Sequence, residues 1–254
     1  MNLLHKPRVL RFVSRHLLCS VPTRERRVAL TFDDGPHPRE TPRLLRLLDA
    51  RRVRATFFLV GRNVLRYPHL AAEIAARGHE IGNHTYNHVV LPLLPRRLML
   101  RELERASRLI QSATGEWPRL FRPPMGWFNR SMMRTVAEHG YRGVLGDVYP
   151  QDTRRPGADV IAQRVLERVR PGSIVILHDG VAFGPGDRSQ SIEAVDLVIE
   201  RLRDRHYEME PVGALVERAQ AHAPGAAAAP ARHGLHAGGQ RPSTDGRLLQ
   251  RHAP

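Results

Sequence analysis

Short apolar segments with the character of β-strands alternate along this chain with longer segments of helical periodicity. The strand-like segments cover residues 27–34, 55–60, 79–83, 141–145, 173–177 and 207–209, with one more near residue 120. The clearest helical segments cover residues 41–52, 95–114 and 191–205. About seven strands that alternate with helices favour a parallel sheet, either open or closed into a barrel. In barrels of this kind the functional side chains sit at the C-terminal ends of the strands.

Local signals refine two of the helices. Thr41 is suited to cap the helix over residues 41–52, and Pro42 suits its first position. One continuous helix is expected from about residue 65 to Gly78, where the glycine ends it.

The composition fits one folded domain with tails. The chain has 254 residues and is 41% hydrophobic, which is enough for a large buried core. From about Ala221 the sequence changes to alanine, glycine, proline, histidine and arginine without apolar periodicity, which predicts disorder. We therefore expect an N-terminal basic and apolar segment over residues 1–25, a folded domain over residues 26–220 and a disordered tail over residues 221–254.

The charge is strongly positive and comes from arginine. The formal net charge is +15, and Lys6 is the only lysine. A nucleic-acid-binding element clusters arginines with aromatic residues, whereas here the arginines are scattered and aromatic residues make up 6%. We expect no nucleic-acid partner, while anionic polymers and membrane surfaces stay open as partners. The single cysteine, Cys19, excludes an internal disulfide framework and a cysteine zinc ribbon, so histidine, aspartate or glutamate must hold any metal.

The first 20 residues form an apolar stretch that Arg8, Arg11 and Arg15 interrupt. It lacks a small-residue cleavage site and a long uncharged run, so it resembles neither a signal peptide nor a transmembrane helix. We expect a helix packed on the domain; the alternative is a basic amphipathic helix that gives residues 1–20 peripheral membrane contact. The absence of an export signal favours the cytoplasm or the inner face of the membrane.

Two adjacent carboxylates, Asp33 and Asp34, stand at the end of the first apolar strand. If both point the same way they repel each other, so one is protonated or a cation lies between them. Consecutive side chains of an extended chain point to opposite sides. The pair can therefore also divide its roles, with one carboxylate on a metal and the other beside it as a base.

His84 and His88 lie four residues apart, directly after a predicted strand. On a helical turn this spacing brings both imidazoles to one face, whereas in an extended chain they would be roughly 13 Å apart. With Asp34 they make a ligand set that leaves coordination positions open for water and substrate, which is typical of catalytic sites. Zinc is the first choice for these ligands, and cobalt or another divalent first-row metal also fits.

Two further strand ends carry candidate catalytic residues. Arg122 follows the strand near residue 120; it either pairs with a carboxylate or is an exposed arginine on a rigid Pro-Pro turn. His178 ends the strand over residues 173–177. It becomes a general acid if a carboxylate raises its pKa, and Asp152 is the candidate for that carboxylate.

Five segments of the chain resemble, in order and spacing, the five motifs of the polysaccharide deacetylase family (NodB homology domain, carbohydrate esterase family 4). The segments are TFDDGP, HTYNH, FRPPMG, DVYPQD and ILHDG, and the resemblance covers about residues 27–215. It implies a distorted (β/α) barrel of about seven parallel strands. It also implies metal-dependent hydrolysis of an N-acetyl group on an amino sugar of a glycan, such as a chitooligosaccharide, peptidoglycan or a glycan precursor.

The resemblance also implies roles for single residues. Asp33 matches the catalytic base, Arg122 the arginine that holds it, His178 the general acid and Asp152 the carboxylate that tunes the acid. The residues that match the metal ligands are Asp34, His84 and His88. The residues expected at the substrate are Pro123, Met125, Gly126, Trp127, Tyr149 and Ile176, with the backbone N–H near Met125 expected to stabilise the oxyanion.

This chain departs from the family pattern around the substrate. Met125 stands where tyrosine is frequent, and Ile176 where leucine is frequent. Tyr149 and Thr153 replace a frequent aspartate and tryptophan. None of these changes removes a catalytic group, so we expect an active enzyme with an altered substrate pocket.

Two alternatives stay open. One is a deacylase or deformylase of a lipid-linked amino sugar, which the basic N-terminal segment favours. The other is a non-catalytic glycan-binding module on the same fold. The intact Asp33, Arg122 and His178 argue against the second, because binding alone needs neither an acid nor a base.

Overall fold

A computed structural model describes residues 17–183 and 186–222. These residues belong to one unit of the chain. Two predicted segments lie largely outside the described residues: residues 1–16 of the expected N-terminal segment and residues 223–254 of the expected tail. The predictions for these residues stay predictions.

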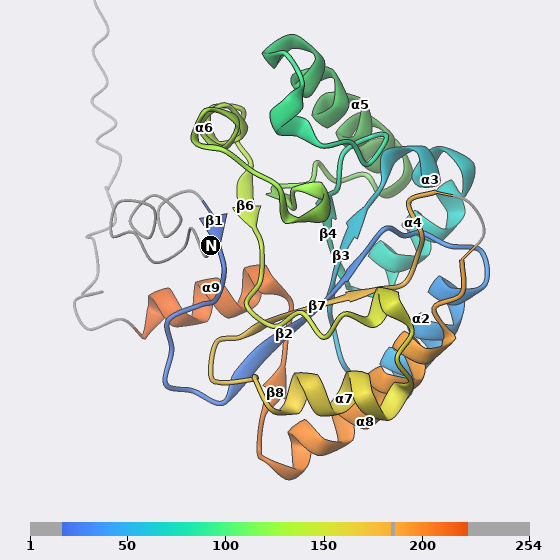
Figure 1. Cartoon of the computed structure of the whole chain (residues 1–254), viewed down its shortest axis with the longest axis vertical. Helices are drawn as coiled ribbons and strands as arrows, with labels where there is room; N and C mark the ends of the chain where they lie inside the picture. Colours follow the sequence, from blue (N-terminus) through green and yellow to red (C-terminus); the bar gives the residue numbers. More distant parts are fainter. Residues whose placement is uncertain (1–16, 184–185, 223–254) are drawn as a thin grey trace, which may run out of the picture. The chain divides into compact units, whose positions relative to one another are not determined.

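A parallel sheet lies at the centre of this unit (Figure 1). Its strand order is β1-β6-β5-β4-β3-β2-β7, and every neighbouring pair is parallel. The strands are β1 Leu17–Leu18, β2 Arg27–Asp33, β3 Thr56–Leu59, β4 Glu80–Asn83, β5 Leu120–Phe121, β6 Arg142–Val144 and β7 Ile174–His178. An eighth strand, β8 Glu208–Met209, pairs with the start of β2.

Two isolated bridges bring the edges of the sheet together. Val148, which follows β6, pairs in parallel with Val175 of β7, and Ser20, which follows β1, pairs with Ser173 just before β7. The sheet therefore curves into an incomplete barrel. The predicted distorted (β/α) barrel of about seven parallel strands is confirmed.

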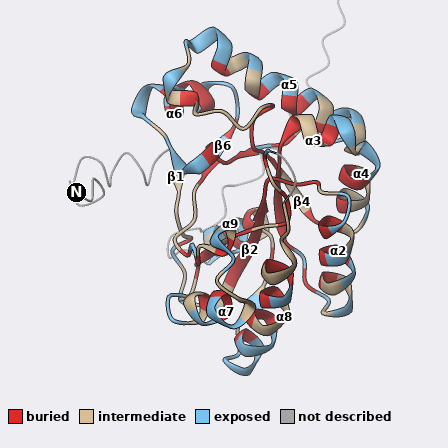
Figure 2. Cartoon of the chain, turned by 45° about the vertical axis from the view of Figure 1, so that its right-hand side comes forward, coloured by how far each residue is buried: buried red, intermediate tan, exposed pale blue. Residues whose placement is uncertain are grey.

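Helices surround the sheet, with their buried faces turned toward it (Figure 2). They are α2 Glu40–Ala50, α3 Gly61–Arg66, α4 Pro68–Ala76, α5 Arg96–Thr114, α6 Arg130–Glu138, α7 Ala158–Leu166, α8 Ser189–Asp204 and α9 Val212–Ala221. Short 3-10 turns are η2 Leu91–Leu93, η3 Pro124–Gly126 and η4 Asp152–Arg154. In α5 the buried residues include Met99, Leu103, Ala106 and Ile110. This spacing of three and four residues forms one apolar stripe on the helix.

Strand β2 is an enclosed strand that carries Asp33 at its end, directly before Asp34. It lies between β3 and β7, and Val28, Leu30 and Phe32 are almost fully buried. A strand covered on both faces is apolar throughout, which explains the continuous apolar run in the sequence. Burial of each such side chain stabilises the fold by about 1.5–3 kcal/mol. The carboxylate of Asp33 therefore emerges from a rigid strand.

Two predictions about helix ends were wrong. Helix α2 begins at Glu40, so Thr41 lies inside its first turn; its hydroxyl accepts a hydrogen bond from the His37 N–H (2.8 Å) and donates one to the Asp179 carboxylate. The continuous helix expected up to Gly78 is divided into α3 and α4 at Tyr67, which has φ −134° and ψ 58°. Pro68 causes the break, because proline disfavours helical backbone in the preceding residue.

The helix expected in the first 20 residues is wrong for Leu17 and Leu18, which the structure describes as a strand. Leu17 and Leu18 form β1, which pairs with Gly143 and Val144 of β6. A two-residue strand has no periodicity of its own, and its pairing partner lies more than 120 residues away in the sequence. Local pattern alone could not indicate it.

Gly82 in β4 is a test of how tightly the barrel is packed. An added Cβ would lie 2.5 Å from the Phe58 ring and 3.2 Å from the Leu120 carbonyl oxygen. We expect Gly82→Ala to lower the free energy of unfolding by about 1–3 kcal/mol, measured by urea denaturation, because overpacking displaces neighbours. The double variant Gly82→Ala/Phe58→Leu should lose less than the sum of the two single losses. Equal stability of Gly82→Ala and the parent protein would contradict this packing.

Candidate active site

A cavity opens at the C-terminal ends of the strands. Strands β2, β4, β5, β6 and β7, or the loops after them, supply its wall. The lining residues are Asp33, Asp34, His84, His88, Arg122, Pro123, Met125, Gly126, Leu145, Gly146, Tyr149, Thr153, Ile176 and His178. All the predicted site residues line this wall except Asp152 and Trp127, and Asp152 lies behind the wall in contact with His178.

Both carboxylates of the Asp33-Asp34 pair face this cavity. They do not alternate as in an extended strand, because Asp34 has φ 72°, in the left-handed region. The side-chain amide of Asn63 donates to the Asp34 carbonyl (2.8 Å), and the Val60 N–H donates to the Gly35 carbonyl (2.9 Å). These bonds hold the turn that gives two adjacent residues access to one site.

His84 and His88 also share the cavity, but not through the helical turn that their spacing suggested. The loop after β4 is irregular, with Thr85 at φ 66° and His88 at φ 56°. The backbone N–H and the side-chain amide of Asn87 each donate to the Glu102 carboxylate at 2.7 Å. A tight turn anchored on α5 therefore brings the two imidazoles together.

Asp34, His84 and His88 form a cluster that can hold a metal ion. One ligand atom from each lies within 4.8 Å of the other two, and the Asp34 Oδ1 is 3.2 Å from His88 Nε2 and 3.6 Å from His84 Nε2. Oδ1 is buried and has no hydrogen-bond partner among the described residues. The Arg122 carbonyl accepts from His84 Nδ1 (2.8 Å), which leaves the lone pair of Nε2 for the cluster. These groups therefore fit a divalent cation.

Electrostatics favour the ligating form of both imidazoles. Burial lowers the pKa of His84, and burial together with the neighbouring His84 lowers the pKa of His88 to about 4. Both rings are then neutral near pH 7, as metal ligands must be. Nitrogen and carboxylate donors suit zinc and also other first-row divalent metals.

Arg122 orients the second carboxylate. Its side chain is 2% exposed, which excludes the exposed-arginine alternative. The Nη1 group donates to Asp33 Oδ1 (2.6 Å) and to the Thr31 hydroxyl (2.7 Å), and the guanidinium lies 4.1 Å from the centre of the Phe58 ring. With Oδ1 held in this way, Asp33 Oδ2 stands 4.0 Å from His84 Nε2, beside the metal cluster.

His178 and Asp152 form a buried pair at the end of β7. Asp152 Oδ1 accepts from His178 Nδ1 (2.9 Å), and Asp152 Oδ2 accepts from the His178 N–H (2.9 Å) and the Ser191 hydroxyl (2.8 Å). Burial alone would lower the pKa of His178, but the charge and hydrogen bond of Asp152 outweigh it and raise this pKa to about 9. Burial likewise opposes ionisation of Asp152, yet His178 and Ser191 lower its pKa. His178 is therefore protonated at neutral pH.

Comparison with known proteins identifies the family of the chain. The family model described as polysaccharide deacetylase matches residues 20–144. A peptidoglycan-N-acetylglucosamine deacetylase from Bacillus cereus is 36% identical over 198 residues, which cover 77% of this chain and 91% of that protein. The chain belongs to the polysaccharide deacetylase family. The resemblance found in the sequence motifs is thus confirmed.

Other members of the polysaccharide deacetylase family match as well. A chitooligosaccharide deacetylase from a Bradyrhizobium species is 40% identical, covering 74% of this chain and 89% of that protein. The crystal structure of the Bc1960 peptidoglycan N-acetylglucosamine deacetylase superposes with a TM-score of 0.77 at 30% identity, covering 81% of this chain and 95% of that one. The match in fold therefore extends over most of the described residues.

The four residues that were expected to differ from the pattern of the polysaccharide deacetylase family, Met125, Tyr149, Thr153 and Ile176, all line the wall of the cavity. Met125 has φ 57° and is 60% exposed, and the Tyr149 hydroxyl lies 2.9 Å from the Thr153 hydroxyl, with its ring 6.1 Å from that of His178. Trp127 is 59% exposed and does not line the wall, so its contact with substrate stays a prediction. The oxyanion role of the N–H near Met125 also stays a prediction.

Sequence reasoning missed two wall residues of the polysaccharide deacetylase site, Leu145 and Gly146, and two residues that support its catalytic groups, Thr31 and Ser191. Thr31 accepts from Arg122, and Ser191 donates to Asp152. Strand alternation offers a signal for the first, since Thr31 lies two residues before Asp33 on the same side of β2. No local signal marks Ser191, because it lies on α8, 39 residues from Asp152 in the sequence.

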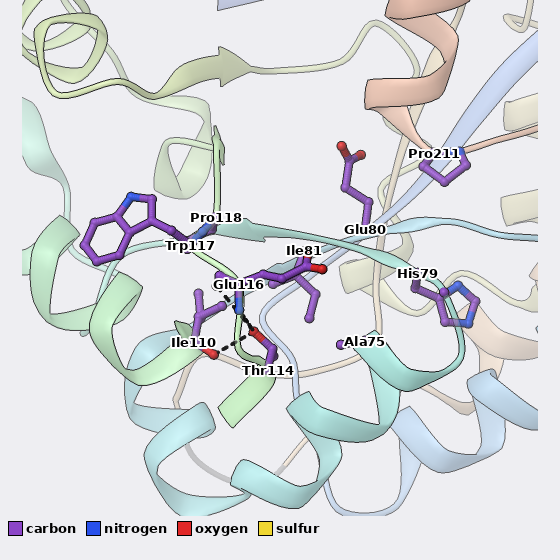
Figure 3. Close-up of a pocket in the computed structure, with 11 residues that line it drawn as sticks. Ala75, His79, Glu80, Ile81, Ile110, Thr114, Glu116, Trp117, Pro118 and Pro211 are labelled. Carbon is purple, nitrogen blue, oxygen red and sulfur yellow. Dashed lines mark hydrogen bonds between the residues drawn. The ribbon is translucent and has the colours of Figure 1, made fainter. Parts of the chain in front are cut away.

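A second cavity lies near the start of β4 and is not suited to the same chemistry (Figure 3). Its His79 accepts a hydrogen bond from the Ala55 N–H at Nδ1 (3.2 Å), and burial lowers the pKa of His79 to about 4. The Thr56 hydroxyl and the Gly213 N–H donate to the Glu80 carboxylate. In Figure 3 the His79 and Glu80 side chains point in different directions, so no reacting pair forms.

Proposed function

We propose that this chain is a metal-dependent hydrolase that removes N-acetyl groups from the amino sugars of a glycan. One observation carries the proposal: a base held by arginine and an acid held by aspartate both line the cavity that contains the Asp34, His84 and His88 cluster. The relatives are peptidoglycan N-acetylglucosamine and chitooligosaccharide deacetylases, which supports N-acetylglucosamine polymers as the substrate class.

Hydrolysis of an amide at this site needs a Lewis acid, a base that activates water and an acid that protonates the leaving nitrogen. Zinc or another divalent ion held by Asp34, His84 and His88 would supply Lewis-acid chemistry, which polarises the carbonyl and makes water more acidic. Asp33 is placed to take a proton from the attacking water at Oδ2, since Arg122 occupies Oδ1. Water oxygen then bonds to the acetyl carbon.

Breaking the C–N bond is the task of His178. An amide nitrogen leaves as an amine only when it gains a proton, and protonated His178 supplies that proton. The products are acetate and the free amino sugar. The apolar side chains of Leu145 and Ile176 line the cavity and offer a surface for the acetyl methyl group.

The substrate class can be tested by measuring acetate and free amine released from N-acetylglucosamine oligomers and from peptidoglycan. We expect equal amounts of acetate and amine from at least one of these polymers. Glycan binding without any acetate release would contradict the proposal and favour the binding-module alternative. Acyl or formyl release from lipid-linked amino sugars alone would move the substrate to the second alternative.

Metal binding by the cluster can be tested separately from activity. We expect His84→Ala to weaken zinc binding at least about 100-fold in calorimetric titration, since one of three ligands is lost. The matched control is His69→Ala, which removes an exposed histidine of α4 and should leave the affinity unchanged. Equal affinity of His84→Ala and the parent protein would exclude this cluster as the metal site.

A further inference from the structure

Most of the exposed large apolar side chains of the described residues lie in loops at the edge of the sheet that carries the active-site cavity. Eight such side chains have exposed fractions from 37% to 75%. Five of them lie in loops that follow the C-terminal ends of β4, β5, β6 and β7. We call these five residues the rim patch: Leu93 (75% exposed), Met125 (60%), Trp127 (59%), Tyr149 (40%) and Phe183 (58%).

Three residues of the rim patch, Met125, Tyr149 and Phe183, lie at or beside the catalytic cavity. Parallel strands end at one edge of their sheet, so the loops after β4 to β7 meet there. Met125 and Tyr149 line the cavity, and the Phe183 ring lies 6.0 Å from the ring of His88. Arg62 packs over the Phe183 ring at 4.4 Å and donates to the Ala182 carbonyl, which holds this aromatic side chain in an exposed position.

Two exposed arginines follow rim-patch residues closely in the sequence: Arg97 lies four residues after Leu93, and Arg154 five residues after Tyr149. Residues 84–95 and 122–129, which contain Leu93, Met125 and Trp127, include no aspartate or glutamate. Arg97 on the first turn of α5 and Arg154 in η4 are exposed, and neither has an ion-pair partner among residues 17–183 and 186–222. The exposed Asp187 in the loop after β7 is paired with Arg155 (2.7 Å).

The combination of exposed apolar side chains with arginines that are unpaired among the described residues fits a lipid surface better than a glycan chain. Aromatic rings can stack on sugars, but Leu93 and Met125 have no flat ring, and a neutral glycan offers no counter-charge to Arg97 and Arg154. At a lipid surface the apolar side chains can insert among the headgroups, and the two arginines can pair with anionic phosphates. Each of the exposed groups then has a partner. Tryptophan and tyrosine are enriched at the same depth of a membrane.

We propose that the rim patch docks on the surface of a membrane that contains anionic phospholipid, with the active-site cavity facing the headgroups. Where the proposed function holds, the cavity then acts on N-acetylated amino sugars of a glycan that lies at that surface. The docking is peripheral. In the part of the chain that the structure describes, no helix has both the length and the hydropathy to cross a bilayer.

The fluorescence of Trp127 gives a direct test. The chain has two tryptophans, so Trp117→Phe leaves Trp127 as the reporter. We expect this full-length variant to bind vesicles of phosphatidylcholine with phosphatidylglycerol, with a blue shift of its emission, and to bind pure phosphatidylcholine vesicles less. Binding without the shift would assign the contact to another part of the chain, such as residues 1–16, and would overturn the proposal, as would the absence of binding.

Paired variants in flotation assays complete the test. We expect Leu93→Gln/Phe183→Gln and Arg97→Gln/Arg154→Gln each to weaken vesicle binding by about tenfold or more. The matched control is Leu65→Gln/Val160→Gln, which removes exposed apolar side chains outside the rim patch and should not change binding. Unchanged binding of the rim variants, with weaker turnover of soluble oligomers, would make the rim patch a glycan platform instead. Vesicle binding without any deacetylation would overturn only the proposed function.

Discussion

Replacing Asp33 with asparagine is expected to lower the rate of deacetylation by about 10²–10⁴-fold while metal affinity stays unchanged. Asparagine has nearly the same shape, and its oxygen can still accept from Arg122, as Asp33 Oδ1 does at 2.6 Å. It cannot take a proton from water. The metal cluster of Asp34, His84 and His88 keeps all its ligands. Rates of acetate release and calorimetric metal titration of the same preparation measure the two quantities.

The control for this experiment is Asp187→Asn. Asp187 is an exposed carboxylate of the loop after β7, and its loss should leave the rate within a factor of about two, as expected for surface substitutions. Retained turnover in Asp33→Asn would remove Asp33 from the role of base. Loss of metal together with activity would show instead that Asp33 belongs to the ligand set.

Asp152→Asn is expected to lower the rate on the order of 10²-fold and to move the alkaline limb of the pH profile to lower pH. His178 must be protonated to act as the acid, so the rate falls as the pH rises through its pKa, which is about 9 in the intact pair. The negative charge of Asp152 raises that pKa. Without this charge burial dominates and lowers the pKa, so the proton is lost at lower pH.

The pH dependence of the maximal rate, together with an NMR titration of His178, checks this prediction. Thr153→Val is the control, because it removes the partner of the Tyr149 hydroxyl near His178 but leaves the bond to Asp152 intact. An alkaline limb that stays in place in Asp152→Asn would mean that His178 is not the group whose protonation limits the rate.

The location of the site could be predicted from the sequence because each motif directly follows an apolar strand. Once β2, β4 and β7 are recognised and the sheet is parallel, Asp33, His84 and His178 must meet at one edge. The strands have strong local signals, since their runs are apolar and short and end at glycine or polar residues. The parallel sheet and the edge that carries the site follow from these signals, whereas the closure into a barrel and the residues expected at the substrate came from the resemblance to the family.

Backbone conformation at the site could not be predicted in the same way. Strand alternation places Asp33 and Asp34 on opposite sides, and only the left-handed conformation of Asp34 turns both into the cavity. Asn63 of α3 and the Asn87–Glu102 contact hold the two turns that carry the metal ligands. These contacts join segments that are distant in the sequence, so no local pattern reports them.

Long-range pairs explain the other omissions. Arg122 and Asp33 are 89 residues apart, and the sequence offered their pairing only through resemblance to the family. Ser191 carries no motif, yet it completes the hydrogen bonds of Asp152. The pairing of β1 with β6 and the bridge of Ser20 to Ser173 also depend on partners more than 120 residues away in the sequence. The bridge of Val148 to Val175 joins segments that are closer in the sequence.

The most direct test of a metal-dependent deacetylase is acetate release from N-acetylglucosamine oligomers by metal-stripped protein, before and after zinc or cobalt is added. We predict no release without metal, recovery of release on addition, and no recovery in His84→Ala, because the variant lacks one ligand of the cluster. Full activity of the stripped protein, or equal recovery in His84→Ala, would contradict the assignment of the cluster of Asp34, His84 and His88 to catalysis.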